Sequence, residues 1–424
     1  MRISNKYFTT HRYYPWLVIA LASSFLFFKY ILQVSPSIMT DELMAEFHIK
    51  GAGLGNLAAS FFYSFLITQL FVGVLLDRYS PRRLTTVAIL LCACGAYGFS
   101  QANSLVLATL TRAFMGIGAA FATVSYMQMT SLWFKPKQFA FVGGLLASAA
   151  MLGAIAGQMP LSLLIHQVGW RNGLRLCAVL GVFLAALFYL VVRDKPSKQA
   201  RSIALPLTAS QFSFQDVWAV LKNKQNWLIT LYSGLAFSPI DAFAGLWSVP
   251  FLKQSYQLTH ARAAFFVSFV FFGLAFGSPV LGLLSDRLGQ RRNIMLGSGC
   301  IALATITLII YSTQLPLFLL ACLLFLFGFS TGAFMLGFAL GRDLNKLTVA
   351  ATIVAFINTG DVIFSAFTEP FIGKLLDKSW SGQIASGVHY FSVMDYRRAL
   401  SLLPVYILLS IILLLFIREP DSRL

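Results

Sequence analysis

The sequence predicts an all-α protein that crosses a membrane twelve times, as two bundles of six helices. Hydrophobic residues make up 58% of the 424-residue chain and charged residues only 11%, whereas a soluble chain carries about 25% charged residues. Apolar runs of roughly 20 residues, the length that spans a bilayer as a helix, recur along the chain. A charged connector occurs twice, as GVLLDRYSPRR from Gly73 and as GLLSDRLGQRR from Gly282, so the second half repeats the first.

The apolar runs between charged or turn-forming residues place the twelve helices. We expect them at residues 16–39, 53–76, 84–99, 105–133, 138–165, 173–192, 227–251, 263–285, 293–311, 317–340, 349–373 and 399–417. The basic start before the first run resembles a signal peptide, but Lys29 interrupts the run, which favours a retained membrane helix. Residues 1–192 and 227–424 are then the two bundles, and residues 193–226 are a cytoplasmic linker.

The net charge of +17 reflects membrane orientation and not nucleic-acid binding, because the basic residues lie in short loops between apolar runs. One set of loops and termini holds 21 of the 32 Lys and Arg residues, and the opposite set holds nine. The richer set is expected to be cytoplasmic, with both chain ends inside. We therefore expect a multi-pass protein of the cytoplasmic (inner) membrane, with the lipid bilayer as its surroundings and no nucleic-acid partner.

The repeated connector resembles the signature of the major facilitator superfamily, Gly-x-x-x-Asp-Arg-x-Gly-x-Arg-Arg between the second and third membrane helices. The second copy keeps the turn glycine as Gly289, whereas the first has Ser80 and then Pro81. The resemblance implies a secondary transporter in which two bundles rock around a central substrate site. It also implies that Asp77, Arg78, Asp286 and Arg287 act at the cytoplasmic gate.

Five ionisable residues fall inside the expected helices, where a charge costs at least about 2.5–3.5 kcal/mol and normally faces a cavity or a partner. They are Lys29, Arg112, Asp241, Asp361 and Glu369. We expect the first four to contribute to substrate binding or proton coupling. Glu369 lies nearer the outer end, and the sequence leaves an interfacial position open for it.

Lys29 and Asp241 occupy matching places in the two halves, 13 residues after Trp16 and 14 residues after Trp227. At 1.5 Å per residue both lie roughly 20 Å from the cytoplasmic end, near the bilayer midplane. Gln33, four residues after Lys29, shares its helix face. We expect Lys29 and Gln33 to face the cavity, with Asp241 binding Lys29, a substrate cation or a proton; a purely structural ion pair is the alternative.

The remaining expected site residues lie on three further helices. Arg112 begins RAFMGIGAA, which resembles the Arg-x-x-x-Gly-x-Gly motif on the family's fourth helix and implies either proton coupling or a clamp between helices. Asn358 precedes Asp361 by about one turn and could line the same path. Tyr126 is a further candidate for the cavity wall, although a packed, hydrogen-bonded tyrosine fits its pattern as well.

Nothing in the sequence indicates an enzyme. The five histidines lie in loops or at helix ends, no nucleotide-binding glycine loop or nucleophile elbow is present, and the five cysteines fall inside apolar runs without zinc-ligand spacing. We therefore expect no cofactor and no bound metal. Transport is expected to draw on an ion gradient, with protons and a small-molecule substrate as partners and a monomer as the working unit.

The mixed charges favour proton-coupled uptake of a small polar organic nutrient, with an amino acid or short peptide as the first expectation. The stretch FKYILQVSPS from Phe28 also resembles the first helix of bacterial phagosomal nutrient transporters, which implies amino acids or nucleosides. Proton-driven export of drugs or siderophores is an alternative, as is import of a siderophore or nucleoside. A membrane receptor without transport is a third class.

Overall fold

The computed structural model describes residues 13–134, 136–194, 218, 220–312, 314–345, 349–385 and 388–419. Most of the expected linker, residues 193–226, lies outside these described residues. The described residues of the first half are helical apart from short connections. Its elements are α1 (Tyr14–Val34), η2 (Ser35–Ile38), α2 (Thr40–Phe47), α3 (Gly51–Arg78), α4 (Pro81–Ser100), α5 (Leu105–Ala119), α6 (Phe121–Trp133), α7 (Pro136–Ala156), α8 (Met159–Val168) and α9 (Trp170–Val191).

The second half repeats this pattern and adds a two-stranded hairpin near its end. Its elements are α11 (Lys224–Pro239), η4 (Ile240–Trp247), α12 (Ser248–Tyr256), α13 (His260–Leu288), α14 (Arg291–Tyr311), α15 (Leu317–Thr331), η5 (Gly332–Phe334), α16 (Met335–Asp343), α17 (Ala350–Ser379), β1 (Ile384–Ala385), β2 (Val388–His389), α18 (Val393–Leu400) and α19 (Leu402–Phe416). The strands pair antiparallel, with Ile384 opposite His389.

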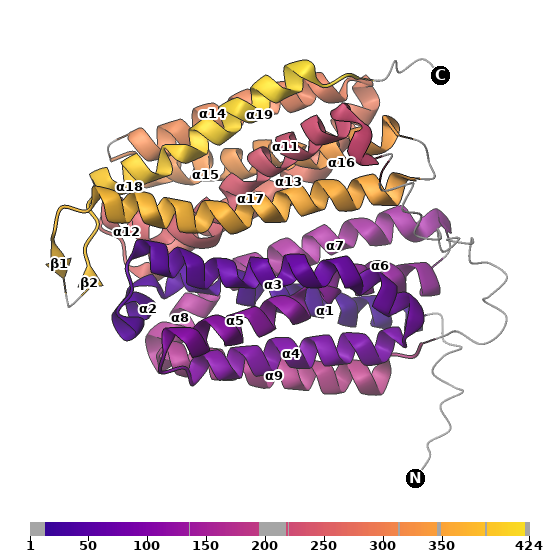
Figure 1. Ribbon diagram of the computed structural model, residues 1–424, viewed down its shortest axis with the longest axis horizontal. Helices are drawn as coiled ribbons and strands as arrows, with labels where there is room; N and C mark the ends of the chain where they lie inside the picture. The colour runs from indigo at the N-terminus through magenta and orange to yellow at the C-terminus, as the bar shows by residue number, and fades with distance from the viewer. Residues whose placement is uncertain are drawn as a thin grey trace, which may run out of the picture.

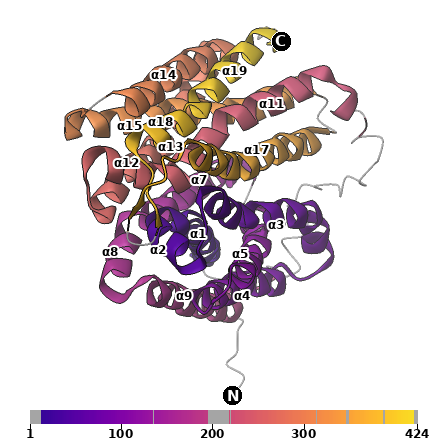
Figure 2. The same ribbon diagram turned by 60° about the vertical axis from the view of Figure 1, so that its left-hand side comes forward.

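The predicted fold class is confirmed, as two bundles of membrane-spanning helices. Eleven described helical segments are long and apolar enough to cross a membrane. The twelfth expected span corresponds to α17, a 30-residue helix that carries Asp361 and Glu369. Figures 1 and 2 show the indigo-to-magenta helices of the first half gathered on one side and the salmon-to-yellow helices of the second half on the other. Large apolar side chains such as Phe183 and Phe318 point outward, as lipid-facing residues do.

The two copies of the connector make their turns by different means. In the second copy Gly289 adopts φ +64° and ends α13 in the left-handed conformation that glycine favours. In the first copy Ser80 accepts a hydrogen bond from the Arg83 N–H and Pro81 occupies the first turn of α4. Asp194 supports this turn by accepting hydrogen bonds from the Ser80 hydroxyl at 2.6 Å and the Arg82 N–H at 2.9 Å. The departure from the family pattern therefore replaces one kind of cap with another.

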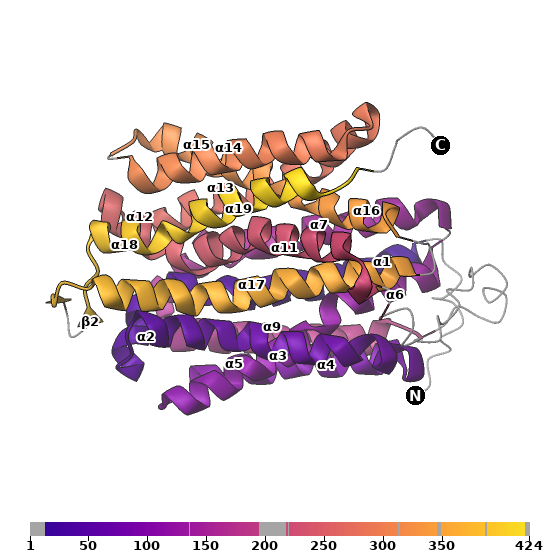
Figure 3. The ribbon, with the colours of Figure 1, turned by 45° about the horizontal axis from the view of Figure 1, so that its top comes forward.

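The two bundles meet closely where α3 begins and α17 ends, which we call the outer end because the positive-inside rule places it away from the cytoplasm. The carboxylate of Asp377 accepts hydrogen bonds at 2.8 Å from the backbone N–H groups of Gly51 and Ala52. These N–H groups start α3 and have no partner within the helix, so a carboxylate caps them favourably. Figure 3 shows α3 and α17 side by side, one from each bundle.

A second contact joins the bundles at the outer end through Asp41. Its Oδ2 lies 2.5 Å from Nζ of Lys253 and 3.4 Å from Nε2 of His260, both of which belong to the second bundle. We call these three residues together with Asp377 the outer lock. Among the described residues we find no hydrogen bond or ion pair between the bundles at the opposite, inner end. The arrangement is therefore closed outside.

Glycine is required where α3 and α17 touch. A Cβ atom at Gly373 would lie 2.2 Å from the carbonyl oxygen of Gly51, which is backbone and cannot rotate away. We expect Gly373→Ala to destabilise the outer closure by about 1–3 kcal/mol, the usual cost of overpacking. Gly297→Ala is the matched control, because a Cβ there meets nothing within 4 Å. Thermal unfolding in detergent measures both, and an equal melting temperature for the two variants would contradict the close contact.

The outer lock also predicts a pH dependence of stability. Burial raises the pKa of Asp41, but hydrogen bonds and charges from His260 and Lys253 outweigh burial and hold that pKa well below its ordinary value. A carboxyl group with a depressed pKa contributes stability above its unfolded pKa of about 3.9 and loses that contribution as pH falls. Asp41→Asn should therefore lower the melting temperature by a constant amount above about pH 5, and by less in stronger acid.

The test compares Asp41→Asn with its parent across pH, with His260→Gln in both proteins so that Lys253 is the ion-pair partner of Asp41. The Lys253–Asp41 contact remains in that background. A difference in melting temperature that grows as the pH falls would contradict the assigned role of the Asp41 carboxylate.

Candidate functional site

The two bundles are linked at mid-membrane by a chain of three polar side chains, Lys29, Gln33 and Asp241. Nζ of Lys29 donates to Oε1 of Gln33 at 2.5 Å, and Nε2 of Gln33 donates to Oδ1 of Asp241 at 3.3 Å. All three are buried, with 6%, 8% and 9% of their surface exposed. The structure thus brings the predicted cation and the predicted carboxylate together, but with an amide between them where sequence reasoning considered a direct pair.

The environment of Lys29 is aromatic. Its Nζ lies 3.7 Å from the ring centroid of Tyr30, 5.4 Å from that of Phe65 and 5.9 Å from that of Phe61. Ring faces attract a cation without neutralising it. Among the described residues, Lys29 therefore has Gln33 as its hydrogen-bond acceptor and three aromatic rings around its ammonium group.

Asp241 occupies an irregular stretch of helix. Residues Ile240–Trp247 form a π-helix directly after Pro239, which interrupts the regular hydrogen-bond ladder. Oδ2 of Asp241 accepts a hydrogen bond from the Ser365 hydroxyl of α17 at 2.8 Å. Within the same π-helix, the carbonyl of Ala244 accepts a hydrogen bond at 3.1 Å from Nε2 of Gln158, which belongs to the first bundle. A π-helix is common at functional sites because it re-aims side chains.

Arg112 holds the end of α1. Its two terminal nitrogens donate at 2.6 Å to the carbonyl of Leu32 and at 2.7 Å to the carbonyl of Gln33. Pro36 has no N–H and so cannot bond the carbonyl of Leu32 four residues earlier. Arg112, only 2% exposed, donates to this carbonyl together with the Ser35 hydroxyl, which lies 2.9 Å from it. Arg112 thereby positions Gln33, whose side chain links Lys29 to Asp241.

The other predicted cavity residues lie apart from this chain. Asp361 is 4% exposed and precedes Ser365 by one helical turn, so it borders the site without bonding Asp241. Asn358 is half-buried on the same helix. Tyr126 is fully buried and donates to the carbonyl of Val142 at 2.6 Å, which ties α6 to α7 within the first bundle.

The predicted gate residues make no described contact between the bundles. Arg78 and Arg287 are exposed at the inner end, and Asp286 lies 3.7 Å from Arg291 of its own bundle. The side chain of Asp77 lies outside what the structure describes. Their gating role stays a prediction, for a conformation in which the inner end closes.

Sequence reasoning missed Ser365 and the outer lock. Ser365 is an ordinary hydroxyl in an apolar helix, and only its spacing of four residues from Asp361 and from Glu369 places it on their stripe. Asp377 and its backbone partners are more than 320 residues apart in sequence. No local pattern signals such a pairing.

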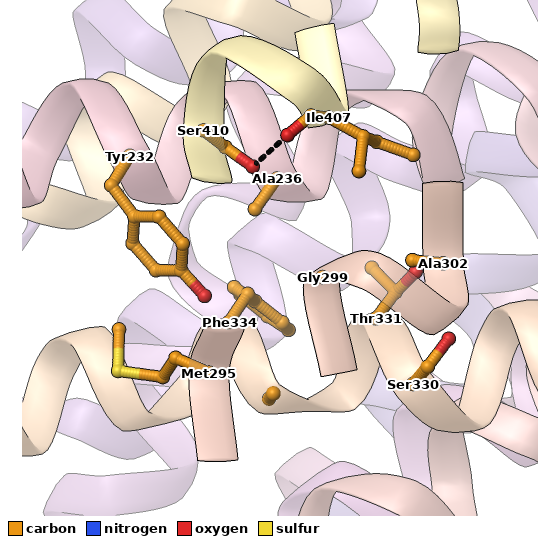
Figure 4. A pocket seen from close by; sticks show the side chains of 11 residues that line it. Tyr232, Ala236, Met295, Gly299, Ala302, Ser330, Thr331, Phe334, Ile407 and Ser410 are labelled. Carbon is orange, nitrogen blue, oxygen red and sulfur yellow. Dashed lines mark hydrogen bonds between the residues drawn. The ribbon is translucent and has the colours of Figure 1, made fainter. Parts of the chain in front are cut away.

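A small pocket lies inside the second bundle and away from the polar chain. Figure 4 shows it between α11, α14, α15 and α19, with Tyr232, Met295, Thr331, Phe334 and Ser410 around it. The Ser410 hydroxyl bonds the carbonyl of Ile407 at 2.7 Å, the contact dashed in the figure. The hydroxyl groups of Ser330, Thr331 and Ser410 bond carbonyls of their own helices, and none of the expected site residues lines the pocket, so this pocket is not the candidate site.

Comparison with known proteins gives a consistent result. A family model described as Major Facilitator Superfamily matches residues 17–368. A Cupriavidus necator protein described as "Probable sulfoacetate transporter SauU" is 20% identical over 67% of this chain and 68% of its own length. An Escherichia coli protein described as "Probable L-galactonate transporter" is 22% identical over 84% of this chain and 82% of its own.

A solved structure shows the same fold. It is a bacterial homolog of the human lysosomal transporter Spinster in an inward-facing, unoccupied conformation, with a TM-score of 0.80 and 14% identity. The match covers 96% of this chain and 97% of that chain.

Proposed function

We propose that this chain, which belongs to the major facilitator superfamily and is a membrane transporter, takes up a small organic anion together with a proton. The observation that carries the proposal is the Lys29–Gln33–Asp241 chain, which places a cation of one bundle near a carboxylate of the other at mid-membrane. Such a pair can bind an anion and a proton in one site.

The coupling follows from electrostatics. While Asp241 is ionised, its negative charge opposes the approach of an anion toward Lys29. When Asp241 takes a proton, its O–H replaces the charge and the cation of Lys29 is left to the substrate. A lower local dielectric than water makes this change large. Proton and anion therefore bind best together, which is the requirement for symport.

The relatives bear on the substrate. Two relatives that match over most of their own length are named for sulfoacetate and for L-galactonate, both small organic anions. This favours a carboxylate or sulfonate over the amino acid or peptide expected from the sequence. A zwitterion remains compatible with the site, since its carboxylate could meet Lys29 and its ammonium Asp361.

The closed outer end suits a cytoplasmic-membrane importer at the stage of release. Rocking of the bundles would break the outer lock, close the inner end and bring the predicted gate residues together. In this cycle a single chain suffices, so we propose a monomer. The uptake assay below measures the direction of transport.

The experiment is a thermal-shift screen of the purified protein, followed by uptake into proteoliposomes. The probes are sulfoacetate, L-galactonate, neutral and acidic amino acids, nucleosides and cationic dyes, each at acidic and neutral pH. A ligand that binds only the folded state raises the melting temperature. We expect shifts from organic anions that are larger in acid and absent in Lys29→Ala. Shifts from cationic dyes alone would overturn the proposal in favour of export.

A further inference from the structure

Glu369 on α17 is a buried carboxyl group that the mechanism above does not use. Glu369 is only 3% exposed, and its Oε2 atom has no hydrogen-bond partner among the described residues. Its backbone carbonyl accepts the indole N–H of Trp247 at 3.2 Å. Asp361, Ser365 and Glu369 are spaced four residues apart and form one stripe along α17. Glu369 is the member nearest the outer end.

Glu369 lies where the two bundles touch. A Cβ atom at Gly55 of α3 would come within 2.6 Å of the carbonyl oxygen of Glu369 and of Cα of Pro370. The ring of Tyr63, two turns further along α3, lies 6.3 Å from that of Phe367. The closed contact of α3 with α17 therefore seals Glu369 from the outer water.

Three ionisable groups lie around Glu369. Arg112 on α5 and Asp241 on η4 act on it electrostatically, and Tyr63 on α3 lies within its influence. Arg112 does not pair with it, because its terminal nitrogens hold α1 carbonyls and no ion pair within 4.0 Å joins the two among the described residues. Nε of Arg112 also has no hydrogen-bond partner within the described part of the chain.

An ionised Glu369 carboxylate would be buried near the Asp241 carboxyl group, and its Oε2 atom would have no hydrogen-bond partner among the described residues. Burial of the charged form is strongly unfavourable, whereas burial of the neutral acid costs far less. In a state with the outer end open, water would solvate Glu369 and the charged form would become favourable. Closure and protonation are thus linked.

We propose that Glu369 is a proton-binding group that controls closure of the outer end. Closure of α3 on α17 requires the protonated acid, whose proton comes from the outer water. When the contact opens, the O–H bond breaks and the proton returns to that water, leaving a carboxylate opposite Arg112. This assignment rests on the alternating-access function proposed above, but it concerns a different carboxyl group from Asp241 and needs no substrate for its test.

The first test is infrared spectroscopy of the purified parent and variant proteins at neutral pH, with each variant spectrum subtracted from that of the parent. We expect a carbonyl stretch of a protonated carboxylic acid that disappears in Glu369→Gln. It should persist in Glu369→Asp and in Glu46→Gln, the matched control, whose carboxylate pairs with Arg171 at the surface. A spectrum unchanged by Glu369→Gln would show that Glu369 is ionised and overturn the proposal.

The second test measures closure itself. Spin labels at Lys50→Cys and Lys374→Cys, both exposed and on opposite bundles, report the α3–α17 distance in a cysteine-free background. We expect the distance to lengthen at alkaline pH in the parent and to stay short in Glu369→Gln. Equal pH responses would overturn the proposal even if the spectrum agreed. Both results holding while no anion is taken up with protons would instead overturn the proposed function alone.

Discussion

Asp241→Asn should abolish proton-driven accumulation of the substrate while leaving substrate exchange intact. Asparagine keeps the shape of the side chain and an oxygen for the Gln33 or Ser365 hydrogen bond, but it cannot give or take a proton. Because it imitates the protonated acid, the variant should bind an organic anion at alkaline pH at least tenfold more tightly than the parent, a difference of about 1.4 kcal/mol.

The measurement is the affinity of the anion found in the screen, determined across pH for parent and variant, with accumulation and exchange in proteoliposomes. Glu419→Gln is a matched control, because its carboxylate accepts the Arg292 N–H at the inner surface, far from the site. An affinity that still rises in acid in Asp241→Asn, with accumulation intact, would show that another group couples the proton.

Arg112→Ala should have the largest effect on stability. It removes two charge-assisted hydrogen bonds to buried carbonyls, at 2.6 Å and 2.7 Å, and leaves a cavity where the guanidinium lay. A hydrogen bond to a charged group contributes about 1.5–3 kcal/mol, so we expect the loss of two to cost about 3–5 kcal/mol. Arg112→Lys should recover part of this, since one ammonium cannot bond both carbonyls in the same geometry.

Unfolding followed by tryptophan fluorescence in detergent measures the effect. Arg262→Ala is the matched control, because that side chain is exposed near the start of α13, where substitutions usually change stability by less than about 0.5 kcal/mol. Equal stability of the two variants would mean that the carbonyls of Leu32 and Gln33 find other donors. A stable Arg112→Ala that lost only transport would place Arg112 in the coupling chemistry and not in the support of α1.

The fold could be predicted because runs of hydrophobic residues identify membrane-spanning helices from local composition alone. Lys29 and Asp241 could be matched because each lies at nearly the same distance from a tryptophan that opens its half. The sequence does not predict that the Gln33 amide lies between Lys29 and Asp241. Gln33 and Asp241 are 208 positions apart, and the side-chain conformation of Gln33 depends on its own backbone, whose carbonyl Arg112 holds. Periodicity identifies a polar face, but only tertiary packing decides which polar groups meet.

The interrupted helices are a second example of structure that the local sequence does not predict. Pro239 signals a weakened helix, yet the sequence does not say whether a kink or an extra residue per turn results. The structure has a π-helix there, which turns Asp241 toward Gln33 and Ser365. The sequence allows Glu369 either an interfacial or a cavity position, and its burial follows from glycines on α3 that no pattern on α17 reveals.

The outer lock and the mid-membrane chain differ in how they respond to ionic strength. Lys253 and Asp41 keep 35% and 45% of their side-chain surface in water, so dissolved ions screen their attraction over a Debye length of about 8 Å at physiological salt. The Lys29–Gln33–Asp241 chain is buried and is screened far less. Added salt therefore loosens the outer end selectively, and the population of the closed conformation depends on the buffer. Transport rates recorded in dilute and in physiological saline describe two different mixtures of conformers.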